Sequence, residues 1–116
     1  MLFRSRDTLR RQGLSDCTLF IYMGDNGFQF GDHGLIDKRT AYEASAKVPL
    51  LMALEGSIPP GVEFDGLVGN IDIAPTILDA VGAPSMPEVD GQSFWPAVKA
   101  NNPAILERKE IGRAHV

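Results

Sequence analysis

The chain has 116 residues, of which 44% are hydrophobic and 22% charged, and its formal net charge is -4. This is the composition of a globular protein, and the length allows one modest domain. The sequence has no basic stripe and no apolar run of membrane-spanning length, so we expect neither a nucleic-acid nor a membrane partner. The single cysteine, Cys17, excludes an intrachain disulfide and a multi-cysteine metal site. It leaves the cellular compartment open.

The first predicted elements are a helix and a strand. The helix ends at Gly13, because Arg10 and Arg11 suit the negative end of a helix dipole and glycine suits the position after it. The strand covers residues 18–23, where apolar side chains follow one another without alternation. That pattern is typical of a strand buried on both faces of a parallel sheet.

The next predicted elements surround a long loop. Residues 24–37 are rich in glycine, and a loop of that length inside a compact domain indicates a functional role. A short helix is predicted over residues 40–47, with Thr40 as N-cap and Glu43 completing a capping box. A second buried strand follows over residues 50–54.

The last third of the chain predicts two helices. Residues 62–68 precede them as a short strand or extended edge. Asp72 caps the first helix, which Gly82 ends, and we prefer this capping role to a catalytic one. Ser93 caps the second helix, in which Trp95 packs in a core or an interface.

Asp25 and Asn26 directly follow the first predicted strand and Gly24. Ligands of open α/β sheets bind beyond the carboxyl ends of strands. A carboxylate and an amide oxygen suit a hard cation such as calcium, which takes roughly six to eight oxygens. The alternative is an Asx turn at the end of the strand. An EF-hand is not favoured, because Phe30 and Ile36 occupy the positions of its glycine and its final glutamate.

Two further side chains of the loop are candidates for binding or catalysis. Lys38 returns a cation thirteen positions after Asp25, and an ammonium group suits the oxygens of an anion. Its alternative role is a surface ion pair with Asp37 or Glu43. His33 either lines the site or holds the loop through hydrogen bonds, and we favour the loop role.

An ordered series of motifs resembles the sulfatase family, within the alkaline-phosphatase-like superfamily. The resemblance covers roughly residues 7–100 and corresponds to the C-terminal part of the catalytic domain. It implies an α/β fold, a partial sandwich in which a mainly parallel sheet carries flanking helices. The motifs are Asp25-Asn26-Gly27, Gly31-Asp32-His33-Gly34, Asp37-Lys38-Arg39-Thr40, Tyr42-Glu43, Val48-Pro49-Leu50-Leu51 and Asn70-Ile71-Asp72-Ile73-Ala74-Pro75-Thr76.

The resemblance also implies roles for single residues. Asp25 and Asn26 match the family's metal ligands, and Lys38 matches the lysine that contacts the sulfate. Phosphatase-like relatives often carry histidine where Asn26 stands, so asparagine favours calcium and a sulfate ester. The family commonly has glutamate at Asp32 and arginine at Lys47, which puts only local hydrogen bonding in doubt.

The chain lacks other parts of the family's active site. The family's nucleophile is a formylglycine made from cysteine or serine in a Cys/Ser-x-Pro/Ala-x-Arg motif, and the residues after Cys17 do not match it. We therefore expect a fragment that is inactive alone and has the remainder of its catalytic domain as partner. The expected substrate is a sulfated small molecule or carbohydrate.

Two other functions stay open, together with the nature of the chain ends. The chain could come from a phosphoester hydrolase of the same superfamily, or it could be a non-catalytic metal-binding or ligand-binding module. Residues 1–5 and 110–116 do not resemble the family, and we expect them to be non-native, adapter-derived ends. His115 then carries no function.

Overall fold

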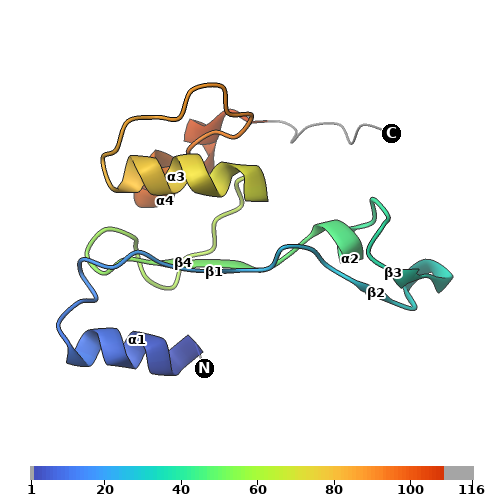
Figure 1. The fold of residues 1–116 in the computed structure, drawn as a ribbon, viewed down its shortest axis with the longest axis horizontal. Coiled ribbons are helices and arrows are strands. Elements are labelled where there is room, and N and C mark those ends of the chain that lie inside the picture. The colour runs from blue at the N-terminus through green and yellow to red at the C-terminus, as the bar shows by residue number, and fades with distance from the viewer. Residues whose placement is uncertain (1, 109–116) are drawn as a thin grey trace. The chain divides into compact units, whose positions relative to one another are not determined.

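The computed structural model describes residues 2–108, with side chains from Arg4 onward, and falls into two compact units, Met1–Gly56 and Ser57–Val116 (Figure 1). None of the described helices has the length and apolar character needed to cross a bilayer. The predicted non-native segment 110–116 lies outside the described residues, whereas residues 2–5 belong to the first helix. Their non-native origin stays a prediction.

The first unit begins with helix α1, Leu2–Arg11. It ends where predicted: Gly13 has a φ of 68°, and the backbone N–H of Leu14 donates to Leu9 O at 2.9 Å. Only glycine adopts this left-handed conformation at little cost. Arg10 then forms an ion pair with Glu55, with 3.0 Å between its Nε and Oε1.

Strands β1 (Phe20–Met23) and β4 (Leu50–Ala53) pair in antiparallel fashion, which corrects the parallel pairing that we expected (Figure 1). A parallel pair needs a crossover that returns the chain to the start of the first strand. Helix α2, Glu43–Ala46, has four residues and spans ~6 Å, about half of the ~13 Å that β1 spans. The chain therefore enters β4 beside the end of β1, where Gly24 N donates to Pro49 O at 3.2 Å.

The pair is also less buried than predicted. Tyr22 lies opposite Leu51, and these side chains are 48% and 53% exposed. Directly opposed residues share one face of the sheet, so this face is open within the described chain. The continuous run of apolar residues predicted a strand buried on both faces. In the described part of this unit, this face of the two-stranded sheet is left exposed.

The glycine-rich loop contains more structure than predicted. Strands β2 (Gln29–Phe30) and β3 (Ile36–Asp37) form a small antiparallel sheet around the 3-10 turn η1, Asp32–Gly34. Thr40 does not cap the following helix. The N-cap of α2 is Tyr42, and the Thr40 hydroxyl is held instead by Gln29 and Ser45.

The second unit contains helices α3 (Ile73–Ala80) and α4 (Trp95–Ala100), preceded by the 3-10 turn η2 (Asn70–Asp72) and followed by η3 (Pro103–Leu106). Its core includes Trp95, as predicted. Residues 62–68 form no strand in the described chain, which corrects the strand alternative of that prediction. The apolar core consists of Phe94, Trp95, Ala97, Val98 and Leu106.

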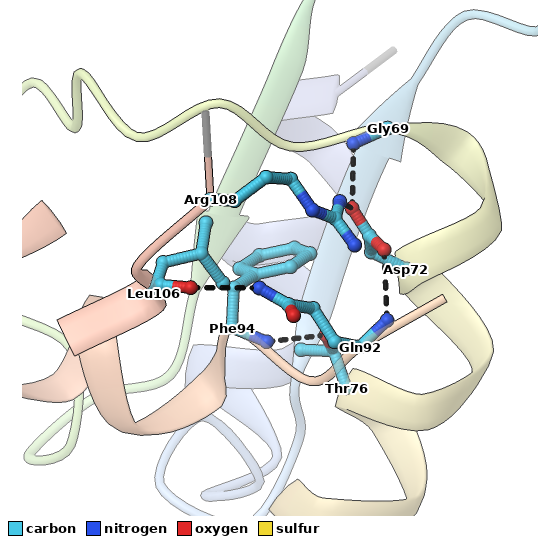
Figure 2. Close-up of polar contacts among 7 residues, drawn as sticks. All are labelled: Gly69, Asp72, Thr76, Gln92, Phe94, Leu106 and Arg108. Carbon is cyan, nitrogen blue, oxygen red and sulfur yellow. Dashed lines mark hydrogen bonds and ion pairs between the residues drawn. The ribbon is translucent and has the colours of Figure 1, made fainter. Parts of the chain in front are cut away.

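Asp72 is fully buried at the start of α3 and accepts three hydrogen bonds (Figure 2). Its Oδ2 accepts from Gly69 N at 2.8 Å and from Arg108, and its Oδ1 accepts from Gln92 N at 2.9 Å. The predicted cap is therefore a junction that joins three segments of the unit. The N-cap of α4 is Phe94, which corrects the predicted Ser93, although Ser93 Oγ accepts from Trp95 N at 3.2 Å.

Candidate functional site

Asp25 and Asn26 follow strand β1 after one intervening glycine, as predicted. Asp25 Oδ1 accepts from Asn26 N at 2.8 Å, a bond to the next residue, whereas the Asx turn that we considered as an alternative bonds to the residue two positions on. The Asn26 amide group is oriented by its own Nδ2, which donates to Gly27 O at 2.7 Å. Both side chains are exposed, which suits groups that receive a ligand.

Lys38 lies beside this strand end. Its Nζ donates to Asn26 Oδ1 at 3.1 Å, across twelve positions of sequence. The alternative partner, Asp37, is bound instead by Arg39, whose Nε donates to Asp37 Oδ2 at 2.6 Å. The Arg39 hydrogen bond, followed by that from the Lys38 backbone N–H, holds the pKa of Asp37 below its usual value. The chain thus directs the Lys38 ammonium towards Asn26.

The oxygen atoms at this strand end fit part of a calcium shell. Asp25 offers a carboxylate and Asn26 an amide oxygen, both hard ligands. The Asn26 oxygen has two lone pairs, so it can accept from Lys38 and still bind a cation. The described residues contain no cluster of three or more His, Cys, Asp or Glu side chains.

His33 takes part in a different contact. Its ring stacks on Tyr42, with 4.0 Å between ring centroids and 18° between planes. Its backbone has a φ of 55°, inside the 3-10 turn η1. This arrangement suits the loop-holding role, through stacking rather than the hydrogen bonds we expected, and a role of His33 in the site stays a prediction.

Sequence reasoning missed a set of buried polar groups behind the site. Gln29 is 0% exposed and Ser45 is 4% exposed. Thr40 Oγ1 donates to Gln29 Oε1 at 2.8 Å and lies 3.0 Å from Ser45 Oγ. One signal was available, because the glutamine stands between two aromatic residues in a short strand. Side chains alternate between the two faces of a strand, so Gln29 faces away from the side of its aromatic neighbours. In this strand the polar Gln29 is the buried residue and Phe30 is exposed.

Gly27 allows two segments of the site to approach closely. Its N–H donates to Ser45 O at 2.8 Å, and a Cβ at this position would lie 2.0 Å from Ala44 O. No side chain fits there unless the backbone of α2 moves. Gly27, the residue after Asn26, therefore lies directly against α2.

Replacing Gly27 by alanine should push these segments apart and destabilise the complete protein by about 1–3 kcal/mol, the range for overpacking. The measurement is the unfolding midpoint. Gly13→Ala is the control, since that position has open space and only a strained φ of 68°. Equal effects of the two substitutions would contradict the close-contact role.

Comparison with known proteins identifies the family. The family model described as N-sulphoglucosamine sulphohydrolase, C-terminal, matches residues 31–111. N-acetylglucosamine-6-O-sulfatase of Bacteroides thetaiotaomicron is 34% identical over 91 residues, which are 78% of this chain and 16% of the relative. N-acetylglucosamine-6-sulfatase of Bos taurus is 45% identical over 84 residues, 71% of this chain and 15% of the relative. Choline-sulfatase of Rhizobium meliloti is 37% identical over 108 residues, 87% of this chain and 20% of the relative.

Solved structures give the same result for the fold. BT4656 in complex with its substrate D-glucosamine-2-N,6-O-disulfate superposes with a TM-score of 0.79 at 32% identity, over 85% of this chain and 20% of that chain. Ps i-CgsB in complex with k-i-k-neocarrahexaose gives a TM-score of 0.71 at 28% identity, over 84% and 24%. This likeness confirms the predicted partial α/β fold of alkaline-phosphatase-like type.

The match is local in every relative. The chain spans only 15% to 20% of the length of the three curated relatives. The matched part is nonetheless most of this chain, and the family model describes a C-terminal region. The chain therefore belongs to the sulfatase family and corresponds to the C-terminal part of a sulfatase.

Proposed function

We propose that this chain supplies metal-binding and sulfate-binding residues to a longer sulfatase, which hydrolyses sulfate esters. The observation that carries the proposal is the contact between Lys38 Nζ and Asn26 Oδ1 at 3.1 Å, in a chain of the sulfatase family. In this proposal Asp25 and Asn26 are calcium ligands, and Lys38 binds the sulfate. The remaining ligands and the formylglycine nucleophile belong to the rest of the catalytic domain.

The chemistry of a sulfate ester requires these charges. Its sulfuryl oxygens are anionic, and negative charge on the leaving oxygen grows as the ester bond breaks. Calcium, when bound, supplies a Lewis acid that polarises the sulfuryl group. Asp25 and Asn26 fix where the cation lies, and the Asp25 carboxylate offsets part of its charge. Lys38 then donates hydrogen bonds to sulfuryl oxygens from the side of Asn26.

The names of similar proteins support a carbohydrate substrate. Two relatives are named as sulfatases of N-acetylglucosamine, and BT4656 was solved with a disulfated glucosamine. We therefore propose a sulfated amino sugar as the substrate of the complete protein. The similarity to choline-sulfatase keeps a small sulfate ester as the second candidate.

A matched pair of substrates tests the reaction. The complete protein should hydrolyse N-acetylglucosamine 6-sulfate in preference to N-acetylglucosamine 6-phosphate, with released sulfate and phosphate measured directly. Faster release of phosphate would support the phosphoester hydrolase instead. Calcium binding without hydrolysis of either ester, or of choline sulfate, would support the non-catalytic module.

Removal of calcium tests the metal assignment. Chelation should abolish sulfate release from the complete protein, and added calcium should restore it. Asp25→Ala should weaken calcium binding by about tenfold or more, because it removes a charged oxygen ligand. Asp16→Ala is the control, since Asp16 is an exposed aspartate that precedes β1. Unchanged calcium titration of Asp25→Ala would exclude Asp25 as a ligand.

A further inference from the structure

A partly buried polar link connects the two halves of the candidate site. The half with Asn26 continues into Gln29, and the half with Lys38 continues into Thr40. The Thr40 hydroxyl joins them, because it donates to Gln29 Oε1 at 2.8 Å. The Gln29 side chain is in turn held by its Nε2, which donates to Asp32 O at 3.4 Å.

The direction of each hydrogen bond in this link follows from a count of protons. The Gln29 carbonyl oxygen only accepts, so the single hydroxyl proton of Thr40 is used there. The Ser45 hydroxyl, 3.0 Å from Thr40 Oγ1, must then be the donor in that contact. Thr40 is therefore required both as a donor and as an acceptor. Serine preserves both functions at this position, and valine preserves neither.

Ser45 extends the link to the metal side of the site. Its backbone O accepts from Gly27 N at 2.8 Å, next to Asn26 in the sequence. Ser45 and Thr40 thus both contact the segment that follows Asn26, at Gly27 and at Gln29. Thr40 also stands two positions after Lys38. The polar groups of Gln29 and Ser45 are buried, where an unpaired group is costly, so the link resists opening.

We propose that Thr40 is a positioning residue of the sulfatase site, whose hydroxyl fixes Lys38 at its distance from Asn26. This inference rests on the proposed function of Lys38 and Asn26. The 3.1 Å contact joins two exposed side chains on separate segments, so the partly buried link between those segments determines how closely they stay together. Catalytic groups must be held within a fraction of an ångström by supporting hydrogen bonds of this kind.

The test compares Thr40→Val with Thr40→Ser in the complete protein. Thr40→Val should lower kcat by about 10-fold to 100-fold, the scale for small misplacements of a reacting group, with KM changed less than about threefold. Thr40→Ser should restore most of kcat. Calcium affinity of Thr40→Val, measured by titration without substrate, should fall less than kcat does.

A second threonine provides the control. Thr76 is 0% exposed, and its hydroxyl accepts from Phe94 N at 3.1 Å in the other unit. Thr76→Val should lower the melting temperature but leave kcat unchanged below that temperature. Equal kcat losses in Thr40→Val and Thr76→Val, or failure of serine to rescue, would overturn the positioning role. If Lys38→Ala has normal kcat, the proposed function fails, whatever Thr40 does.

Discussion

Lys38→Ala in the complete sulfatase should reduce kcat for a sulfate ester by about two to three orders of magnitude, the scale for removing one electrostatic stabiliser. Its ammonium group lies at the proposed metal ligand, with Nζ 3.1 Å from Asn26 Oδ1, while Arg39 occupies Asp37. If the charge of Lys38 acts on oxygens that gain charge in the transition state, the loss appears in kcat as well as in kcat/KM. Binding that is uniform between substrate and transition state would change KM alone.

The measurement is steady-state kinetics with an aryl sulfate, beside calcium titration of the same variant. Calcium affinity should change little, because Lys38 is not a ligand of the cation. Lys99→Ala is the control, since Lys99 is an exposed lysine of the other unit whose Nζ lies 5.8 Å from the Trp95 ring centroid. Near-normal turnover of Lys38→Ala with weakened calcium binding would make Lys38 a structural partner of the loop.

The sequence predicted those parts of the fold that depend on local signals. Gly13 ends α1 and the Asp72 region begins α3, because caps and left-handed glycines act within a few residues. The direction of the sheet was predicted wrongly. Whether β1 and β4 run parallel depends on the path of the 26 residues between Met23 and Leu50, which no local pattern records.

The same distinction explains what was predicted of the site. The sequence indicated that the loop returns the Lys38 cation towards Asp25, and in the structure Lys38 contacts the neighbouring Asn26. The sequence assigned the Thr40 hydroxyl to a helix cap. Its partner in the structure, Gln29, lies eleven positions before it and competes with the local cap. A long-range hydrogen bond to the buried Gln29 outweighs a capping preference of about 1 kcal/mol.

The junction at Asp72 provides the second large effect. Sequence reasoning identified a cap, but Arg108 contacts the same carboxylate from thirty-six positions away (Figure 2). The pair is buried, with side chains 0% and 10% exposed for Asp72 and Arg108. Arg108→Met should therefore destabilise this region of the complete protein by about 3–5 kcal/mol, because it leaves a buried carboxylate without its cation.

Amide hydrogen exchange at Gly69 and Gln92 measures this loss locally, since both N–H groups donate to Asp72. Their opening free energies should fall in Arg108→Met. The control, Arg10→Met, removes an ion pair whose side chains are 55% and 50% exposed. It should change the opening free energies at Gly69 and Gln92 by less than about 1 kcal/mol. Unchanged exchange in Arg108→Met would show that the two backbone donors suffice to hold the carboxylate.

The pH dependence identifies the charge as the cause. Burial is the largest single influence on the pKa of Asp72 and raises it, but the hydrogen bonds from Arg108, Gly69 and Gln92 together lower it below its usual value. The stabilisation by Asp72 is therefore complete above its unfolded pKa of about 3.9 and is lost as pH falls through the lower folded value. In Arg108→Met, fewer hydrogen bonds oppose the effect of burial on the pKa of Asp72. The Asp72 carboxyl group therefore takes up a proton at higher pH, and the cost of its buried charge disappears. The stability gap between wild type and variant should narrow from pH 7 towards pH 4, and a constant gap would mean that Arg108 acts through packing alone.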